Sequence, residues 1–381
     1  MVTGVAAVPD RPLRIGVDAR ELQGRPTGVG RYLRNLVRGL TEGHGDTVVA
    51  FVVGQPPADR VLEHPLVEVR PLRRMRPGLA WQQLSLPPSV RTNTLDVFFA
   101  PAYTCPWFLG IPCVTTVHDL SFFALPEDFA WLDGVRRRVT VAASIRASAR
   151  VIAVSDFTRR EIVSRFPAAA DRVVTIPHGS DDDLPPAPVR DEARARLGLR
   201  GPLVLTVGTV FGRRRLPVLL RAVSRLRARF PGLRLDVVGD VRAHPPFDGP
   251  ALARRLGLQD CVSFSGFVDE AGLADRYASA NAAVFLSAYE GFGLPALEAM
   301  ARGVPVVVSD RPALNEIFGE AALVAPLEDE QAIADAIARL LLDEGLRETL
   351  LHRGRTLAAR HSWTVTARRT HEALLAAARE P

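Results

Sequence analysis

The sequence predicts an α/β protein made of two doubly wound, Rossmann-like domains that face each other across a cleft. Three observations lead to this class. A chain of 381 residues is too long to form a single ordinary hydrophobic core and suits two domains of about 150–200 residues each. Short β-branched runs alternate with helical patterns throughout the chain. A segment rich in aspartate and proline, at residues 180–189, interrupts this alternation and reads as a linker.

The strands are continuous apolar runs between helices, which is typical of parallel sheets covered on both faces. In the first half we predict strands at residues 13–19, 47–54, 67–72, 96–101, 113–120, 151–155 and 172–177. In the second half we predict them at residues 203–209, 233–240, 262–267, 282–288, 304–310 and 321–326. The domains should therefore span residues 1–182 and 190–363. Ligands of such folds bind beyond the carboxyl ends of the strands, so the loops there should carry the function.

The helices fit the same scheme. After residue 209, Leu216, Leu219, Leu220 and Val223 repeat at helical spacing, and arginines occupy the other side. This pattern predicts an amphipathic helix with one face on a sheet.

Composition excludes several classes of protein. The chain contains no lysine, so a pyridoxal phosphate Schiff base and a standard P-loop are excluded. The net charge of +6 comes from arginines scattered along helices, which indicates no nucleic-acid partner and leaves a peripheral contact with a membrane surface open.

The three cysteines favour inert thiols in a reducing compartment, the cytoplasm. No apolar run approaches the ~20 residues of a membrane span, and residues 1–12 read as a short leader without a secretory signal.

The segment SAYEGFGLPALEAMARGVPVVVSD, residues 287–310, carries the strongest functional signal. A glycine turn with Gly291 and Gly293 leads into a helix, for which Pro295 suits the first position. The backbone N–H groups of Phe292, Gly293 and Leu294 should form an anion site at the start of that helix. Two carboxylates, Glu290 and Glu298, flank the turn and can accept hydrogen bonds from hydroxyl groups. A ligand with phosphate in the middle and hydroxyls at both ends, such as a nucleotide sugar, fits this layout.

Cations for such a ligand follow the first strand of the second half. Arg213, Arg214 and Arg215 precede a helix, where positive charge is unfavourable to the helix dipole and hence suggests function. Arginine binds phosphate oxygens in bidentate geometry and can stabilise a leaving diphosphate.

Two loops of the first half should also lie near the ligand. Gly28 and Gly30 form a glycine turn before a helix whose apolar face includes Leu33 and Leu36. His118 ends an apolar strand, in a loop position that faces the expected cleft.

These residues resemble glycosyltransferase family 4, the retaining enzymes of GT-B fold. The match covers residues 13 to the C-terminus and includes the family's Glu-x7-Glu motif, from Glu290 to Glu298. Further landmarks occur in the family's order: TGVGRYLRNL, TVHDLSFF, VIAVSDFTRREI, VGTVFGRRRLPVLLRA and FSGFVDEAGLADRYASANAAVFLS. Two positions depart from the family. Its common Arg-Lys-Asn is Arg213-Arg214-Arg215 here, and its frequent Pro-Asn-Gly is Pro177-His178-Gly179.

The resemblance implies roles for these residues. Glu290 would hold hydroxyls of the transferred sugar, Glu298 would hold the ribose, and His118 would lie near the reacting sugar. Catalysis would rest on His118, Arg213, Arg214 and Glu290. The resemblance also implies that a helix at residues 364–381 crosses back onto the N-terminal domain. The donor would contact a wider set: Gly28, Gly30, Thr209, Phe267, Val268, Gly291, Phe292, Gly293, Leu294 and Glu298.

The implied reaction is glycosyl transfer with retention of configuration, without a cofactor and without a metal site. The partners would be a nucleotide-sugar donor, with GDP-mannose favoured, and a glycan, lipid-linked or small-molecule acceptor. Candidate acceptor contacts are residues 73–76 with Trp81, or residues 122–131. UDP-sugars stay open as donors. A nucleotide-sugar epimerase and a non-catalytic GT-B partner protein are the alternatives from other classes.

Overall fold

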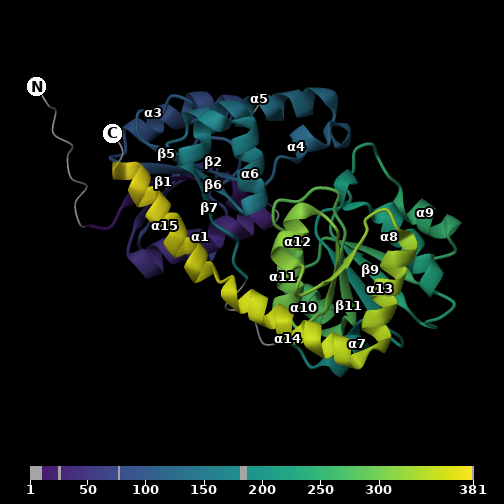
Figure 1. Ribbon diagram of the computed structural model, residues 1–381. Coiled ribbons are helices and arrows are strands. Elements are labelled where there is room, and N and C mark those ends of the chain that lie inside the picture. Colours follow the sequence, from purple (N-terminus) through teal and green to yellow (C-terminus); the bar gives the residue numbers. More distant parts are fainter. Residues whose placement is uncertain (1–10, 25–26, 76–77, 181–186, 380–381) are drawn as a thin grey trace, which may run out of the picture. The chain divides into compact units, whose positions relative to one another are not determined.

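The computed structural model describes residues 11–24, 27–75, 78–180 and 187–379, and the chain divides into two compact units (Figure 1). The first unit runs to Leu120 and resumes over Val135–Gly179 and again from Ser362. The second comprises Ser121–Gly134 and Ser180–His361. Most of the predicted leader, residues 1–10, and most of the predicted linker, residues 181–186, lie outside the described residues.

The boundaries differ from the predicted ones over residues 121–134, which we placed in the N-terminal domain. This segment groups with the second unit. Within that unit, Asp128 Oδ1 lies 3.7 Å from Arg215 Nη1, and a Cβ on Gly212 would lie 2.6 Å from the same carboxylate oxygen. The segment therefore contacts the turn that follows the first strand of the second sheet.

The first unit is built on a seven-stranded sheet with the order β3-β2-β1-β4-β5-β6-β7, and all of its strand pairs are parallel. This is the doubly wound arrangement that we predicted. The strands are β1 Arg14–Asp18, β2 Thr47–Val53, β3 Val67–Leu72, β4 Val97–Ala100, β5 Cys113–Val117, β6 Arg150–Ala153 and β7 Val173–Thr175.

Both faces of the first sheet are covered, as the continuous apolar strands predicted. Consecutive residues of a strand point to opposite faces. Phe98 packs in a cluster with Trp81 and Leu86, whereas the ring of Phe99 lies 6.5 Å from that of Tyr32. The helices of this unit, and those that begin in residues 121–134, are α1 Gly28–His44, α2 Gly78–Ala80, α3 Leu86–Arg91, α4 Ser121–Ala124, α5 Trp131–Ala147, α6 Asp156–Arg165 and α15 Trp363–Arg379, with a π-helical turn at Trp81–Ser85.

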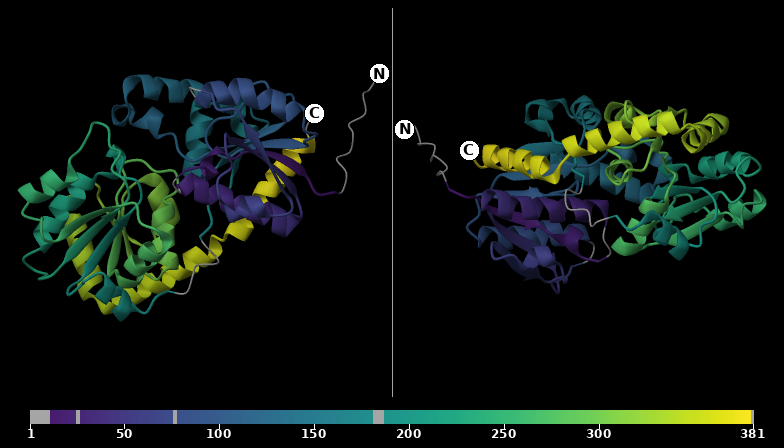
Figure 2. Two further views of the ribbon diagram at one scale, coloured as in Figure 1. Left: turned by 180° about the vertical axis from the view of Figure 1, so that it is seen from behind. Right: turned by 90° about the horizontal axis from the view of Figure 1, so that it is seen from below.

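The last helix, α15, lies along α1 in the first unit (Figures 1 and 2). The two helices approach so closely that a Cβ on Gly39 of α1 would overlap the Cβ of Ala367. A buried carboxylate also joins them to the sheet. Asp46 accepts hydrogen bonds from the backbone N–H of Leu13, at 2.9 Å, and from Nδ1 of His371, at 2.7 Å. The C-terminal segment is thus an integral layer of this unit.

The second unit is built on a six-stranded parallel sheet with the order β10-β9-β8-β11-β12-β13. Each strand that we predicted in either half of the sequence is present. The strands of this sheet are β8 Leu203–Val207, β9 Arg234–Val238, β10 Val262–Gly266, β11 Ala282–Phe285, β12 Val306–Ser309 and β13 Leu323–Ala325.

Helices cover both faces of the second sheet (Figure 1). Val284 joins a core with Leu219 of α8 and Ile333 of α13, as the amphipathic pattern after residue 209 predicted. Phe285 faces the other way, toward α11 and α12. The helices are α7 Arg190–Arg196, α8 Leu216–Leu226, α9 Gly249–Arg255, α10 Glu270–Ser279, α11 Leu294–Ala301, α12 Pro312–Phe318, α13 Glu330–Leu342 and α14 Glu344–Arg360. Across the described residues, no helix has the length and apolar character that crossing a membrane requires.

The close approach of α1 and α15 makes a prediction with an internal control. Gly39→Ala should lower the free energy of unfolding by about 1–3 kcal/mol, because the new methyl group overpacks the contact with Ala367. Gly43→Ala, four residues later in α1, should raise it by roughly 0.5–1 kcal/mol, because a Cβ there meets no described atom within 4 Å and alanine favours the helix. Urea unfolding of both variants measures the two signs. Equal stability of both variants would show that the helices do not pack as described.

Candidate active site

The predicted ligand turn lies between β11 and α11 in the second unit, and glycine is required within it. Gly293 precedes α11 in a left-handed conformation, with φ of +102°. A Cβ there would lie 2.9 Å from side-chain carbons of both Leu314 and Phe318. Pro295 occupies the second position of the helix, one later than predicted. Among the described residues, the backbone N–H groups of Gly293 and Leu294 have no hydrogen-bond acceptor, which leaves them available to an anion.

Buried serine hydroxyls hold this turn in place. The N–H of Ser287 donates to Oγ of Ser309 at 3.0 Å, and that hydroxyl donates to the carbonyl oxygen of Ser287 at 2.8 Å. Oγ of Ser287 donates to the carbonyl oxygen of Tyr289 at 2.8 Å. The N–H of Ala288 donates to the carbonyl oxygen of Arg213 at 2.7 Å and so joins the turn to the arginine loop. The two predicted loops are therefore one connected structure.

The central contact of this structure is an ion pair between Arg214 and Glu290. Nη1 of Arg214 lies 3.2 Å from Oε2 of Glu290, and the side chains are only 16% and 12% exposed. The guanidinium carbon of Arg214 also lies 4.0 Å from the centre of the Phe285 ring, within cation–π distance. A cation for phosphate oxygens and an acceptor for hydroxyl groups are therefore side by side at the carboxyl ends of neighbouring strands.

The other two arginines of the loop contact different side chains. The guanidinium carbon of Arg213 lies 4.8 Å from the ring centre of Phe211. Arg215 is left-handed, with φ of +45°, and its guanidinium approaches Asp128 and Glu328 at 3.7 and 3.8 Å. The family's asparagine at this position tolerates the left-handed conformation better than arginine does.

The remaining predicted donor contacts of the second unit lie at the same edge of the sheet. A small pocket at the end of β8 includes Gly208, with φ of +118°, and Arg214. Thr209 follows and is half-buried. Phe267 and Val268 follow β10, and Phe267 is exposed. Glu298 lies inside α11 and is buried. Gly291 and Phe292 are buried parts of the turn itself.

In the first unit, the two predicted glycines differ in what they meet. Thr27 caps α1 by accepting a hydrogen bond from the N–H of Gly30 at 2.9 Å. A Cβ on Gly30 would lie 2.6 Å from the carbonyl oxygen of Glu21, so packing requires this glycine. A Cβ on Gly28 would meet no described atom within 4 Å, and its φ is not positive. Nothing within the described part of the fold requires glycine at 28, which suits close approach by a ligand.

His118 lies just after β5, buried against a second histidine that the sequence analysis left without a role. Nε2 of His118 lies 2.7 Å from the carbonyl oxygen of Pro101, and Nδ1 lies 3.3 Å from Nε2 of His178. The ring centres lie 5.2 Å apart, and the ring planes are nearly parallel, with an interplanar angle of 17°. Burial lowers the pKa of both imidazoles, that of His178 most, and the neighbouring imidazole lowers it further. Both rings are therefore neutral at pH 7.

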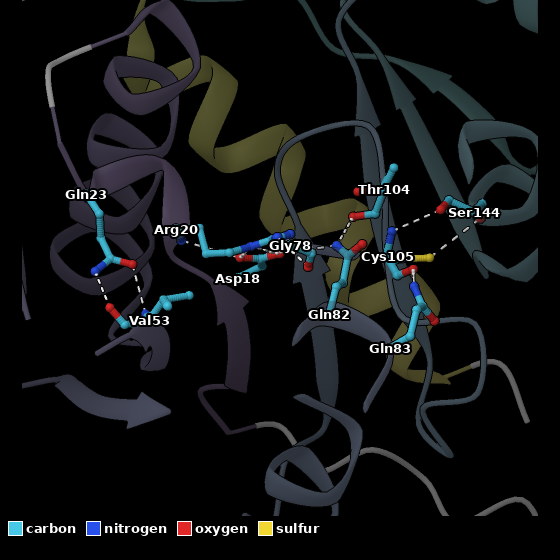
Figure 3. A network of polar contacts seen from close by, with 10 residues as sticks. All are labelled: Asp18, Arg20, Gln23, Val53, Gly78, Gln82, Gln83, Thr104, Cys105 and Ser144. Carbon is cyan, nitrogen blue, oxygen red and sulfur yellow. Dashed lines mark hydrogen bonds and ion pairs between the residues drawn. The ribbon is translucent and has the colours of Figure 1, made fainter. Parts of the chain in front are cut away.

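A second polar network follows β1, and the sequence analysis missed it (Figure 3). Nε and Nη2 of Arg20 donate to the two carboxylate oxygens of Asp18 at 2.8 and 2.6 Å. Nε2 of Gln82 donates to Asp18, at 3.3 Å, and to the carbonyl oxygen of Thr104, at 2.8 Å. The polar run Asp-Ala-Arg at the end of a buried strand was the available signal. Trp81, a candidate for acceptor binding, is 1% exposed beneath Arg20 and is not a surface contact.

Two families match the two halves of the chain. Residues 26–184 match the family described as Glycosyltransferase Family 4, and residues 189–357 match the one described as Glycosyl transferases group 1. The chain is 35% identical over 266 residues to the O-antigen chain mannosyltransferase B of Escherichia coli, and this match covers 66% of each of the two chains. It is 35% identical over 284 residues to the D-inositol 3-phosphate glycosyltransferase of Actinosynnema mirum, covering 70% of this chain and 66% of that one. The matches thus span about two thirds of these relatives.

Among solved structures, HepE of Anabaena, in complex with UDP-glucose, superposes with a TM-score of 0.75 at 20% identity. The superposition covers 94% of this chain and 98% of that one, which shows a shared fold. The family matches, the relatives and the two parallel-sheet units agree, and the chain belongs to glycosyltransferase family 4, with the GT-B fold.

Proposed function

We propose that this chain is a retaining hexosyltransferase that uses a nucleotide diphosphate sugar as donor. The Arg214–Glu290 pair beside the N–H groups of Gly293 and Leu294 supports this most directly. Arginine and a helix start suit a diphosphate, and a carboxylate suits the hydroxyl groups of a sugar. The open position at Gly28 supports a second approach of backbone to the ligand.

In this proposal, positive charge for the leaving diphosphate comes from Arg213, Arg214 and the start of α11, so no metal is required. Glu290 would hold hydroxyls of the transferred sugar and Glu298 the ribose, with Phe267 and Val268 near the base. His118 has both ring nitrogens bonded within its own unit. We therefore assign it to shaping the sugar site rather than to proton transfer. The acceptor's proton would pass to the leaving phosphate.

Mannose from GDP-mannose is the donor that we favour, since an O-antigen chain mannosyltransferase is among the relatives at 35% identity. UDP-sugars are the alternative donors. The acceptor would be a glycan, a lipid-linked saccharide or a small molecule.

The release of nucleoside diphosphate separates transfer from the alternative functions. A transferase would release it only in the presence of acceptor, which an epimerase or a non-catalytic GT-B protein would not do. An anomeric proton with unchanged configuration in the NMR spectrum of the product would demonstrate retention.

An exposed apolar face on α5 supports contact with a membrane surface, as a lipid-linked acceptor would need. Trp131 and Leu132 are 74% exposed, and Val139 is 59% exposed. Helical spacing places these side chains on one face with the exposed Arg136. Aromatic and apolar side chains next to arginine suit the interface of an anionic bilayer.

Donor binding is tested by thermal unfolding with GDP, UDP, ADP, GDP-mannose and UDP-glucose. A ligand at 100 times its Kd stabilises the folded state by about 2.7 kcal/mol, which corresponds to roughly 5–10 °C for a domain of this size. We expect the largest shift with GDP species. A larger shift with UDP species would replace the favoured donor, and no shift with any nucleotide would reject the proposed activity.

Arg214 variants locate the diphosphate in the same assay. Arg214→Met should abolish most of the shift, because a charge-assisted contact to phosphate is lost, whereas Arg214→Lys should retain it. The control is Arg221→Met, since Arg221 lies on the exposed side of α8 with its side chain 44% exposed. Equal loss in Arg221→Met and Arg214→Met would point to a general charge effect.

Glu290→Gln should lower kcat/KM for the donor sugar. A hydrogen bond to a charged group contributes about 1.5–3 kcal/mol, which corresponds to roughly 10- to 150-fold in rate. Initial rates of nucleoside diphosphate release, with acceptor present, measure this effect. Binding of the free nucleoside diphosphate should change much less, since Glu290 is assigned to the sugar. A variant with unchanged kcat/KM would remove Glu290 from the sugar site.

The membrane contact is tested by sedimentation with vesicles of anionic phospholipid. Replacing both Trp131 and Leu132 by serine should weaken binding, because burial of apolar area drives interfacial association, and added salt should weaken binding of the unmodified chain. Leu342→Ser, at a 57% exposed position on α13, is the control. If the unmodified chain stays in the supernatant at low salt, the α5 face has another role.

A further inference from the structure

We propose that His178 is a positioning residue that fixes the tautomer and orientation of His118. This inference rests on the proposed function, in which the loop after β5 shapes the sugar site. The residue occupies the place of the family's frequent asparagine, in the segment Pro177-His178-Gly179.

The proton positions in this pair follow from the acceptor at one end. A carbonyl oxygen only accepts, so Nε2 of His118, 2.7 Å from the carbonyl oxygen of Pro101, must carry the proton. In the neutral ring, Nδ1 then carries the lone pair. Nε2 of His178, 3.3 Å away, must donate to it. The carbonyl of Pro101 therefore determines the tautomers of both rings. Nδ1 of His118 can only accept a hydrogen bond, and His178 supplies the donor.

Packing fixes His178 itself. Its ring meets the Tyr32 ring edge to face, with the centres 4.9 Å apart, and lies 6.0 Å from the Trp363 ring. Tyr32 belongs to α1, four residues after Gly28, and Trp363 begins α15. A Cβ on Gly179 would overlap the backbone of Trp363, so the chain after His178 lies directly against α15. The histidine thus joins the loop after β5 to both helices of one face of the first unit.

Tyr32 and Tyr103 complete the surroundings of His118. The Tyr32 ring meets that of His118 edge to face at 5.1 Å, and the Tyr103 ring lies at 5.3 Å. The hydroxyl of Tyr103 donates to Asp119 at 2.9 Å, and that of Tyr32 lies 2.9 Å from Oγ1 of Thr116. Asp119, buried next to His118, is the charged group nearest in sequence, and it favours protonation of His118. Burial outweighs it and keeps the imidazole neutral.

The decisive experiment compares a replacement that can donate with one that cannot. The amide nitrogen of glutamine reaches as far along the side chain as Nε2 of histidine and can donate to Nδ1 of His118, whereas leucine has no donor. Selectively ¹⁵N-labelled histidine shows which ring nitrogen carries the proton. We expect the proton on Nε2 and a hydrogen-bonded Nδ1 in the unmodified chain and in His178→Gln, and an unbonded Nδ1 in His178→Leu. A proton on Nδ1 of His118 in the unmodified chain would overturn the proposal without any variant.

Kinetics give the functional readout. In His178→Leu, kcat should fall roughly 10- to 100-fold, the range expected for misplaced groups in a site. KM for the donor should change less than about twofold, and His178→Gln should retain most of the kcat of the unmodified chain. The control is His352→Asn, an exposed histidine on α14. Unchanged kcat in a folded His178→Leu would refute the positioning role. An unmodified chain without any transfer would instead reject the proposed function, and the NMR result would still stand.

The pH dependence of stability provides an independent arm. The pKa of His178 is lower in the fold than its ordinary value of 6.5, so the unfolded chain takes up the proton first as the pH falls. The stability linked to the neutral His178 is therefore fully present above about pH 6.5. Below that pH the free energy of unfolding declines. His178→Asn removes one such group and should make the decline between pH 7 and pH 5 shallower. An unaltered decline in His178→Asn would show that His178 is not buried as a neutral ring.

Discussion

The ion pair between Arg214 and Glu290 organises the carboxyl edge of the second sheet. Its two members come from the loops after β8 and β11, which are neighbours in the sheet, so parallel pairing brings them to one edge. Each side chain is largely buried, and either charge alone would be costly there. The pair keeps both charges in place until a ligand can meet them. A diphosphate would bind the arginine, and sugar hydroxyls would donate to the carboxylate. Ligand binding would thus replace the ion pair by contacts with the ligand.

The first unit prepares its loops in a different way. Its polar groups at the strand ends are mostly bonded to one another: His118 to His178 and Pro101, Tyr103 to Asp119, and Asp18 to Arg20. Such networks in a low-dielectric interior are rigid because breaking any bond leaves a buried polar group unsatisfied. The second unit therefore offers charge, whereas the first offers fixed shape and the exposed turn at Gly28.

The glycines in these loops occur for different physical reasons, which the sequence does not distinguish. Gly293 is demanded by a left-handed conformation and by contact with α12, and Gly30 by the carbonyl of Glu21. Gly28 is demanded by neither. In the sequence, all three belong to glycine turns that precede a helix, and nothing there separates them. The structure assigns two of them to packing and leaves the third as the position that points most directly to a ligand.

The sequence alone determined the class of fold, the position of every strand and the amphipathic face of α8, because these depend on the period of apolar residues along the chain. It also indicated the glutamate turn and the arginine loop. Only the tertiary structure decided that Arg214 meets Glu290, that His178 contacts His118, and that Trp81 is buried beneath Arg20. The members of these pairs are 60 to 76 residues apart in the chain. Their contact follows from strand order and helix packing, which no local pattern encodes.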